Sequence, residues 1–310
     1  MPFVTPRRRR SIRSGAREQA GTSLYPKGNP MRFTHLLCGS LALAVASPAF
    51  AQETVGPPNT PTDAVGDTAP PPALKVTGGA TLTSDYRFRG LTQTNEDPAI
   101  QGTVNLNHES GFYVGVWGST IDGGSDGSTP ALTNYGDVEL DLYGGYTKNF
   151  ASGVGVDVGL LYYYYPDGAS GLNTDFFEPY ASVTYTIGPV ATKAGVAYAW
   201  GGQDGLDFTG GKDDNIYAFL DGSIGVPSTP LTLKAHVGYS NGSLGLANPT
   251  PLDDDYYDWS LTAELVHGPF KAGVSYVDTD ITGRNVAGIG KFAKQLGRDA
   301  TVLGYVGFSF

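Results

Sequence analysis

Twelve segments of this chain alternate apolar and polar residues with a period of two. Because successive side chains of a β-strand point to opposite faces, each segment predicts a strand with one apolar and one polar side. The segments are 80–89, 99–108, 112–121, 135–148, 154–165, 176–187, 190–200, 214–225, 231–240, 256–266, 270–278 and 300–310. Such a chain is restricted to an all-β fold, either a soluble sandwich or a membrane barrel.

The connections between the segments alternate in length. The short ones are 108–111, 149–153, 188–189, 226–230 and 267–269, and the long ones are 90–98, 122–134, 166–175, 201–213, 241–255 and 279–299. Outer-membrane barrels combine short periplasmic turns with long external loops, whereas a sandwich has no reason to keep this rule. The sequence therefore predicts a transmembrane antiparallel β-barrel of about 12 strands. No run of eighteen apolar residues is present, which excludes a helical membrane protein.

The N-terminal part has the pattern of an export signal. After Met31, two basic residues precede an apolar run at 36–46 and an A-x-A motif that ends at Ala51. We therefore expect a signal peptide over 31–51. Cys38, the only cysteine, lies inside the apolar run without the small preceding residue of a lipoprotein, so the mature chain has no thiol chemistry.

Residues 1–30 are interpreted as a mis-assigned upstream extension; a twin-arginine signal built on the arginines at 7–10 is the alternative. Residues 52–74 are expected to form a disordered Pro-rich periplasmic leader, and 75–310 the barrel. Removal of residues 1–51 takes away eight basic residues and one acidic residue and leaves 12 against 29, a net charge of −17. Nucleic acid is a poor partner for such a surface.

Aromatic residues of the apolar faces gather at the predicted outer ends of the strands. They are Tyr86, Phe88, Tyr162, Tyr164, Phe177, Tyr198, Trp200, Tyr239, Tyr257, Trp259 and Tyr276. Amphipathic rings favour the membrane interface, so these residues predict an aromatic girdle. The last segment carries Val302, Val306, Phe308 and Phe310 on one face, a pattern typical of the signal that barrel-assembly machinery recognises.

The polar faces carry charges that lipid would not tolerate, so they are predicted to line the lumen. The predicted lining is Asp85, Arg87, Arg89, Gln101, Asp137, Glu139, Asp141, Asp157, Glu178, Lys193, Asp221, Lys234, His236, Glu264 and Lys271. Arg87 and Arg89 are expected to project from one strand to the same side, with Glu139 as a candidate partner. Eight strands leave an interior filled by side chains and sixteen leave a channel, so a narrow, acid-dominated pore and a salt-bridged plug both remain open.

Catalysis and metal binding are not expected. The predicted mature chain has three histidines (His108, His236 and His267) and contains neither a G-x-S-x-G nor an H-E-x-x-H motif. The acidic run 253–255, and Asp122 with Asp126, do not match the spacing of an EF-hand. No cofactor is implied.

Four blocks resemble a known family. SDYRFRGLTQTNEDPAIQG (84–102), HESGFYVGVWGS (108–119), YGDVELDLYGGYTKNF (135–150) and GLLYYYYPDG (159–168) are similar to blocks of the TorF-type putative porins of proteobacteria. The resemblance covers roughly residues 78–310 and implies a porin-like barrel without catalytic residues. We expect passive diffusion of small hydrophilic solutes or ions; the alternative is a non-conducting structural or adhesive barrel acting through its external loops.

The longest connection, 279–299, concentrates basic residues. Lys291, Lys294 and Arg298 are spaced as on one face of a short helix. Such a loop either enters the pore mouth or lies against the outer leaflet. We favour the leaflet, with lipid and lipopolysaccharide as partners, because the apolar residues Phe292 and Leu296 suit a membrane boundary.

Overall fold

A computed structural model describes residues 73–123, 134–171, 173–206, 214–245, 255–281, 285–286, 290–291 and 297–310. The predicted extension, the signal peptide and most of the leader lie outside these residues. So do Asp126, Asp253, Asp254, Phe292, Lys294 and Leu296, on which the calcium and loop interpretations depend.

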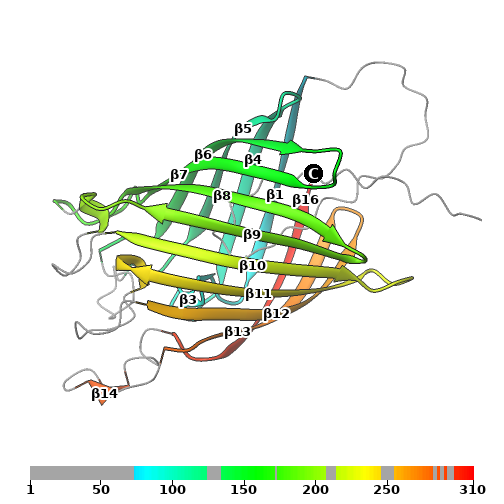
Figure 1. The fold of residues 1–310 in the computed structure, drawn as a ribbon. Coiled ribbons are helices and arrows are strands. Elements are labelled where there is room, and N and C mark those ends of the chain that lie inside the picture. Colours follow the sequence, from blue (N-terminus) through cyan, green and yellow to red (C-terminus); the bar gives the residue numbers. More distant parts are fainter. Residues whose placement is uncertain are drawn as a thin grey trace, which may run out of the picture. The chain divides into compact units, whose positions relative to one another are not determined.

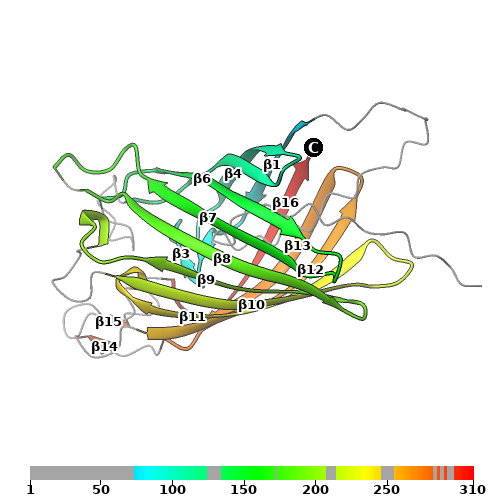
Figure 2. The same ribbon diagram turned by 45° about the horizontal axis from the view of Figure 1, so that its top comes forward.

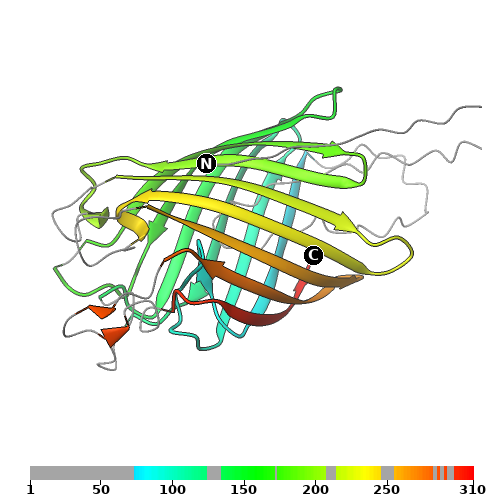
Figure 3. The same cartoon turned by 60° about the horizontal axis from the view of Figure 1, so that its bottom comes forward.

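Twelve strands of the described part form one closed antiparallel barrel (Figure 1). They are β1 (Leu74–Thr83), β4 (Ala99–His108), β5 (Phe112–Thr120), β6 (Val138–Asn149), β7 (Gly155–Tyr164), β8 (Phe176–Ile187), β9 (Val190–Ala199), β10 (Asn215–Gly225), β11 (Leu231–Gly242), β12 (Asp255–His267), β13 (Phe270–Thr279) and β16 (Thr301–Ser309). Each strand pairs with its neighbours in this order. The ring closes between β1 and β16, where Leu82 lies opposite Val306 (Figure 3). Closure leaves no unpaired edge, as a lipid environment demands.

The predicted fold class is confirmed, including the alternation of connections. Short turns lie at one end of the barrel and long connections at the other (Figure 2). The long connections hold the short elements: β2 (Arg87–Phe88), β3 (Leu91–Thr92), η1 (Asp204–Leu206), η2 (Ser243–Gly245), β14 (Asn285–Val286) and β15 (Gly290–Lys291). Among the described residues, no helix is long and apolar enough to cross a membrane.

The outer surface of the barrel is a band of exposed apolar side chains. Ile100 is 64% exposed, Leu261 61% and Val302 66%, and similar residues recur on every strand. An exposed apolar surface that runs around the whole barrel is not compatible with water, but it matches the lipid-facing band of a transmembrane barrel. The period-two pattern of the sequence thus separates lipid from lumen.

Inside the barrel, large aromatic rings lie over glycines of the neighbouring strand. Tyr143 lies opposite Gly115, Phe219 opposite Gly195, and Tyr305 opposite Gly273. A Cβ at Gly115 would lie 2.5 Å from the Tyr143 ring, so only glycine leaves room for the ring to lie flat against the wall. The abundance of Gly and Tyr therefore has a structural cause.

The first barrel strand has the predicted length of ten residues, but it begins and ends six residues earlier. The sequence predicts a strand over 80–89, but β1 ends at Thr83 and residues 84–98, here called the inward segment, fold into the lumen. Figures 1 and 2 draw β3 within the ring of strands. The change of direction has a local cause, because the Asp85 carboxylate accepts hydrogen bonds from Thr92 (2.6 Å) and Thr94 (3.1 Å) and so folds the segment back on itself. Arg89 and Gly90, with φ of 49° and 81°, form the tip between β2 and β3.

Candidate functional site

The inward segment crosses the lumen and contacts opposite walls of the barrel. The Tyr86 ring packs on Trp117 of β5 with centroids 5.3 Å apart, and the Phe88 ring packs on Tyr163 of β7 at 5.9 Å. On the far wall, the Tyr256 hydroxyl of β12 donates to the Arg89 carbonyl at 3.1 Å. The segment therefore narrows the lumen near the end that carries the long connections.

Arg89 anchors this segment through a buried ion pair. Its Nη2 lies 2.8 Å from both carboxylate oxygens of Glu178 on β8. Its guanidinium also lies 4.3 Å from the ring centroid of Tyr217 on β10, a cation–π contact. Charge-assisted bonds in a dry environment are stronger than in water, so these contacts fix the tip of the segment against two strands.

Arg87 binds a different set of partners. Its Nε donates to Asp85 at 2.5 Å, and its guanidinium also reaches Glu96 and the Gly297 carbonyl. The sequence predicted that Arg87 and Arg89 project from one strand to the same side, with Glu139 as a candidate partner. That prediction is wrong, because the chain has left the barrel wall before Arg87, and Arg89 lies at the tip between β2 and β3.

The end of the longest connection also lies at this constriction. Thr92 donates its backbone N–H to the Gly297 carbonyl at 3.3 Å, and Thr279 donates its hydroxyl to the Arg298 carbonyl at 2.9 Å. Burial lowers the pKa of Arg298 to about 10. The sequence placed Arg298 on one face of a short helix in a loop that was favoured to lie against the outer leaflet, but the residue is buried beside the inward segment.

Two of the predicted girdle residues lie in the lumen instead. Tyr86 is 3% exposed and Phe88 packs against the inner aromatic cluster, because the inward segment carries both away from the membrane interface. The outer ends of the strands retain Tyr162, Tyr164, Phe177, Tyr198, Trp200, Tyr239, Tyr257, Trp259 and Tyr276. Several of these stack with one another, as Phe177 and Trp200 do at 6.0 Å.

A second polar network lines β10 to β12. His236 lies between two carboxylates, with Nδ1 2.6 Å from Asp221 and Nε2 3.1 Å from Asp258. Lys234 forms a buried ion pair with Glu264 at 2.8 Å. In this network the basic side chains of the inner wall are each paired with a nearby acid.

The structure places the other predicted lining residues as follows. Asp157 accepts a hydrogen bond from Tyr113 at 2.6 Å, Gln101 is buried, and Lys193 and Lys271 lie over the rings of Phe219 and Tyr305, each at 5.7 Å. Asp137 is exposed just before β6. Glu139 and Asp141 lie buried on β6 among aromatic rings.

The lining predicted from the sequence lacks Asp258 and the lumen tyrosines. Asp258 binds both His236 and Tyr217 and lies within the predicted strand 256–266, yet the predicted lining on that strand included only Glu264. The signal was available, because Asp258 lies two residues before Ser260 and so shares its face. The inner tyrosines Tyr113, Tyr163 and Tyr217 were likewise detectable from their phase.

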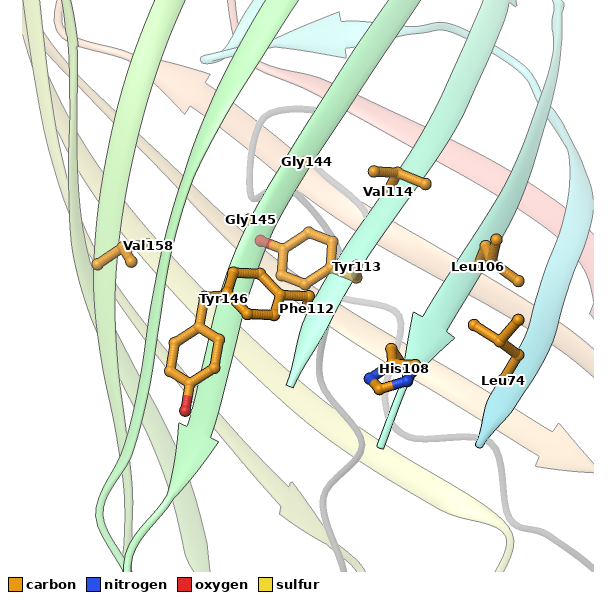
Figure 4. A pocket seen from close by; sticks show the side chains of 10 residues that line it. All are labelled: Leu74, Leu106, His108, Phe112, Tyr113, Val114, Gly144, Gly145, Tyr146 and Val158. Atoms are coloured by element: carbon orange, nitrogen blue, oxygen red, sulfur yellow. The ribbon is translucent and has the colours of Figure 1, made fainter. Parts of the chain in front are cut away.

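A shallow hollow of about 540 Å³ lies on the barrel near the short-turn end (Figure 4). Its lining is Leu74, Leu106, His108, Phe112, Tyr113, Val114, Gly144, Gly145, Tyr146 and Val158. Leu74, Phe112, Val114 and Val158 are exposed on the lipid-facing surface. The hollow is therefore not part of the lumen.

No cluster of three or more acidic, His or Cys residues that could hold a metal ion occurs in the described ranges.

Residues 67–310 match a family described as "Bacterial protein of unknown function (Gcw_chp)". The chain belongs to this family. No curated protein matches it significantly.

Several solved structures are similar to this member of the Gcw_chp family. The NanC porin shares 11% identity, with 76% of this chain and 99% of that chain covered and a TM-score of 0.47. The KdgM porin in complex with disordered oligogalacturonate shares 8% identity over 76% and 99% of the two chains, with a TM-score of 0.46. An outer-membrane channel from Pseudomonas putida F1 shares 12% identity over 78% and 96%, with a TM-score of 0.44.

Proposed function

We propose that the protein is a porin-like outer-membrane channel for passive diffusion of small hydrophilic solutes or ions. One observation carries this proposal: charged and polar side chains line the lumen of a closed barrel, while the outside is apolar. Lumen charges interact with solutes that cross, whereas a barrel that served only as a scaffold would be more stable with apolar residues inside. The resemblance to TorF-type porins points in the same direction.

The inward segment gives the channel its narrow part. The segment occupies the lumen between β5 and β12 and is held by the Arg89–Glu178 pair. Passage is therefore confined to the space between the segment and the wall. We propose that small ions and solutes use this space, and that the acid-dominated wall favours cations.

One observation favours the alternative function, a non-conducting barrel that acts through its external loops. Tyr86, Arg87, Arg89, Leu91 and Thr92 are each less than a tenth exposed, so the inward segment fills much of the lumen at its level. A plug of this kind would leave adhesion or structural support as the role of the barrel.

Planar-bilayer recording separates the two functions. The full chain, exported and purified from outer membranes in detergent, is added to a planar bilayer in potassium chloride. A channel gives discrete conductance steps, which a heat-denatured sample lacks. The absence of steps from folded protein would favour the plugged barrel and overturn the proposal.

We also propose an outer-membrane location after export by the predicted signal peptide. In the described barrel, Val302, Val306 and Phe308 point to the lipid side of β16, and Phe310 follows them at the chain end. This row supports recognition by the barrel-assembly machinery, and lipid with lipopolysaccharide is the expected surrounding. Deletion of Phe310 should lower the fraction of barrel in outer-membrane fractions, as measured by immunoblot.

A further inference from the structure

Two lumen acids have no counter-charge. Glu139 and Asp141 lie two residues apart on β6, and only 2% and 3% of their surfaces are exposed. Neither forms an ion pair with any residue that the structure describes. Glu139 Oε2 and Asp141 Oδ1 are buried and accept no hydrogen bond within the described ranges.

The nearby cation is already engaged. Arg89 donates from Nη2 to both carboxylate oxygens of Glu178, a third acid close to Asp141. Of the three acids, only Glu178 is paired with this guanidinium in the described structure. This part of the lumen therefore has more acidic than basic side chains. Burial of an ionised carboxylate without a partner costs several kcal/mol, so a bound cation would stabilise the two acids.

Aromatic rings enclose the two acids. Trp117 is the cross-strand neighbour of Asp141 on β5, and Tyr163 is its neighbour on β7. The Tyr165 hydroxyl donates to Glu139 Oε1 at 3.3 Å, and the Tyr86 hydroxyl also lies beside this carboxylate, whereas Oε2 accepts no hydrogen bond within the described ranges. The rings of Tyr86 and Trp117, and of Tyr135 and Tyr165, pack at 5.3 Å and 4.6 Å. Ring faces attract cations, so the enclosure adds to the attraction of the acids.

We propose that Glu139 and Asp141 form a binding site for the ammonium group of a primary amine. An ammonium carries three N–H donors, two of which match the two free carboxylate oxygens, while the rings receive its charge and its alkyl chain. A metal ion fits less well, because no set of three or more metal-binding side chains surrounds the pair in the described ranges. The proposal deepens the proposed channel function, since the amine reaches the site through the lumen.

Binding is measured without any need for conduction. Isothermal titration calorimetry of the full chain in detergent uses 1,4-diaminobutane as the probe. Glu139→Gln and Asp141→Asn should each weaken binding about tenfold or more, since each removes a charge-assisted hydrogen bond. Asp97→Asn is the matched control, because Asp97 is an exposed acid of the inward segment and should bind like the unsubstituted chain. Tetramethylammonium has no N–H donor and should bind about tenfold more weakly than the diamine.

Three results would overturn the site: no heat of binding with the unsubstituted chain, equal affinity in the variants, or magnesium chloride binding in place of the amine. Equal affinity would mean that the acids hold protons and recognise no cation. The folding of each variant is first checked by comparing the gel migration of boiled and unboiled samples. Trp117→Phe provides a second folded variant, because it keeps both acids and should weaken binding modestly. Amine binding without conductance would overturn the channel alone, and conductance without binding would overturn the site alone.

Discussion

The Arg89–Glu178 pair illustrates how single residues set the shape of this lumen. Arg89 lies at the tip of the inward segment with a positive φ, and Glu178 projects from β8 on the wall. Both side chains are almost fully buried, so neither charge can rely on water. The pair is therefore specific: each charge is tolerated only because the other is present.

Glu178→Gln should release the inward segment from the wall. The substitution leaves the Arg89 charge buried without a full counter-charge, which costs about 3–5 kcal/mol in a buried site. We expect single-channel recordings to show a larger and noisier conductance. The double variant Arg89→Gln with Glu178→Gln should show less current noise than the single variant, because no unpaired buried charge remains at this position.

Glu264→Gln is the control for this prediction. It breaks the Lys234–Glu264 pair, which has the same 2.8 Å separation and is also buried, but which lies toward the short-turn ends of β11 and β12. A similar conductance change in both variants would show that loss of any buried pair disturbs the barrel, and would contradict a specific role for Glu178.

At the scale of the strands, glycines and aromatic rings are matched in register. The Tyr305 ring of β16 lies over Gly273 of β13, and Phe219 of β10 lies over Gly195 of β9. Each ring lies against the backbone of the next strand, where only a glycine leaves room for it. The composition of neighbouring strands is therefore matched residue by residue along the inner wall.

Gly273→Ala should destabilise the barrel. A Cβ at this position would overlap the Tyr305 ring, and relief of such overpacking costs about 1–3 kcal/mol. Gly222→Ala is the control, because its nearest neighbour atom, on Val190, would be 3.9 Å away. Urea unfolding in lipid vesicles, followed by tryptophan fluorescence, measures both; equal midpoints would refute the packing argument.

At the scale of the whole barrel, most lumen charges are compensated. Arg87, Arg89 and Lys234 each pair with an acid, and His236 lies between two. The uncompensated pair, Glu139 and Asp141, lies on one wall. From this distribution we expect a weakly negative lumen field at the level of the inward segment.

We expect a weak preference for potassium over chloride that fades as salt rises. The Debye length falls from about 10 Å at 0.1 M salt to about 3 Å at 1 M, so a concentrated ionic solution screens the wall charges. Reversal potentials in a salt gradient, measured at low and at high mean concentration, test this. Preference for chloride, or a cation preference that does not change with salt, would contradict the expectation.

The sequence by itself determined the number of strands, the two faces of the barrel and the alternation of its connections, because side-chain alternation is a local property of the backbone. Leu261 faces lipid and Ser260 faces the lumen because neighbouring side chains of a strand point to opposite faces, and this alternation can be read from three consecutive residues. The tertiary structure decided where β1 ends. Residues 84–89 continue the alternation of a strand, yet they turn inward because Asp85 binds Thr92 and Arg89 binds Glu178. The second of these partners lies 89 positions away in sequence, and a period of two carries no information about contacts at that separation.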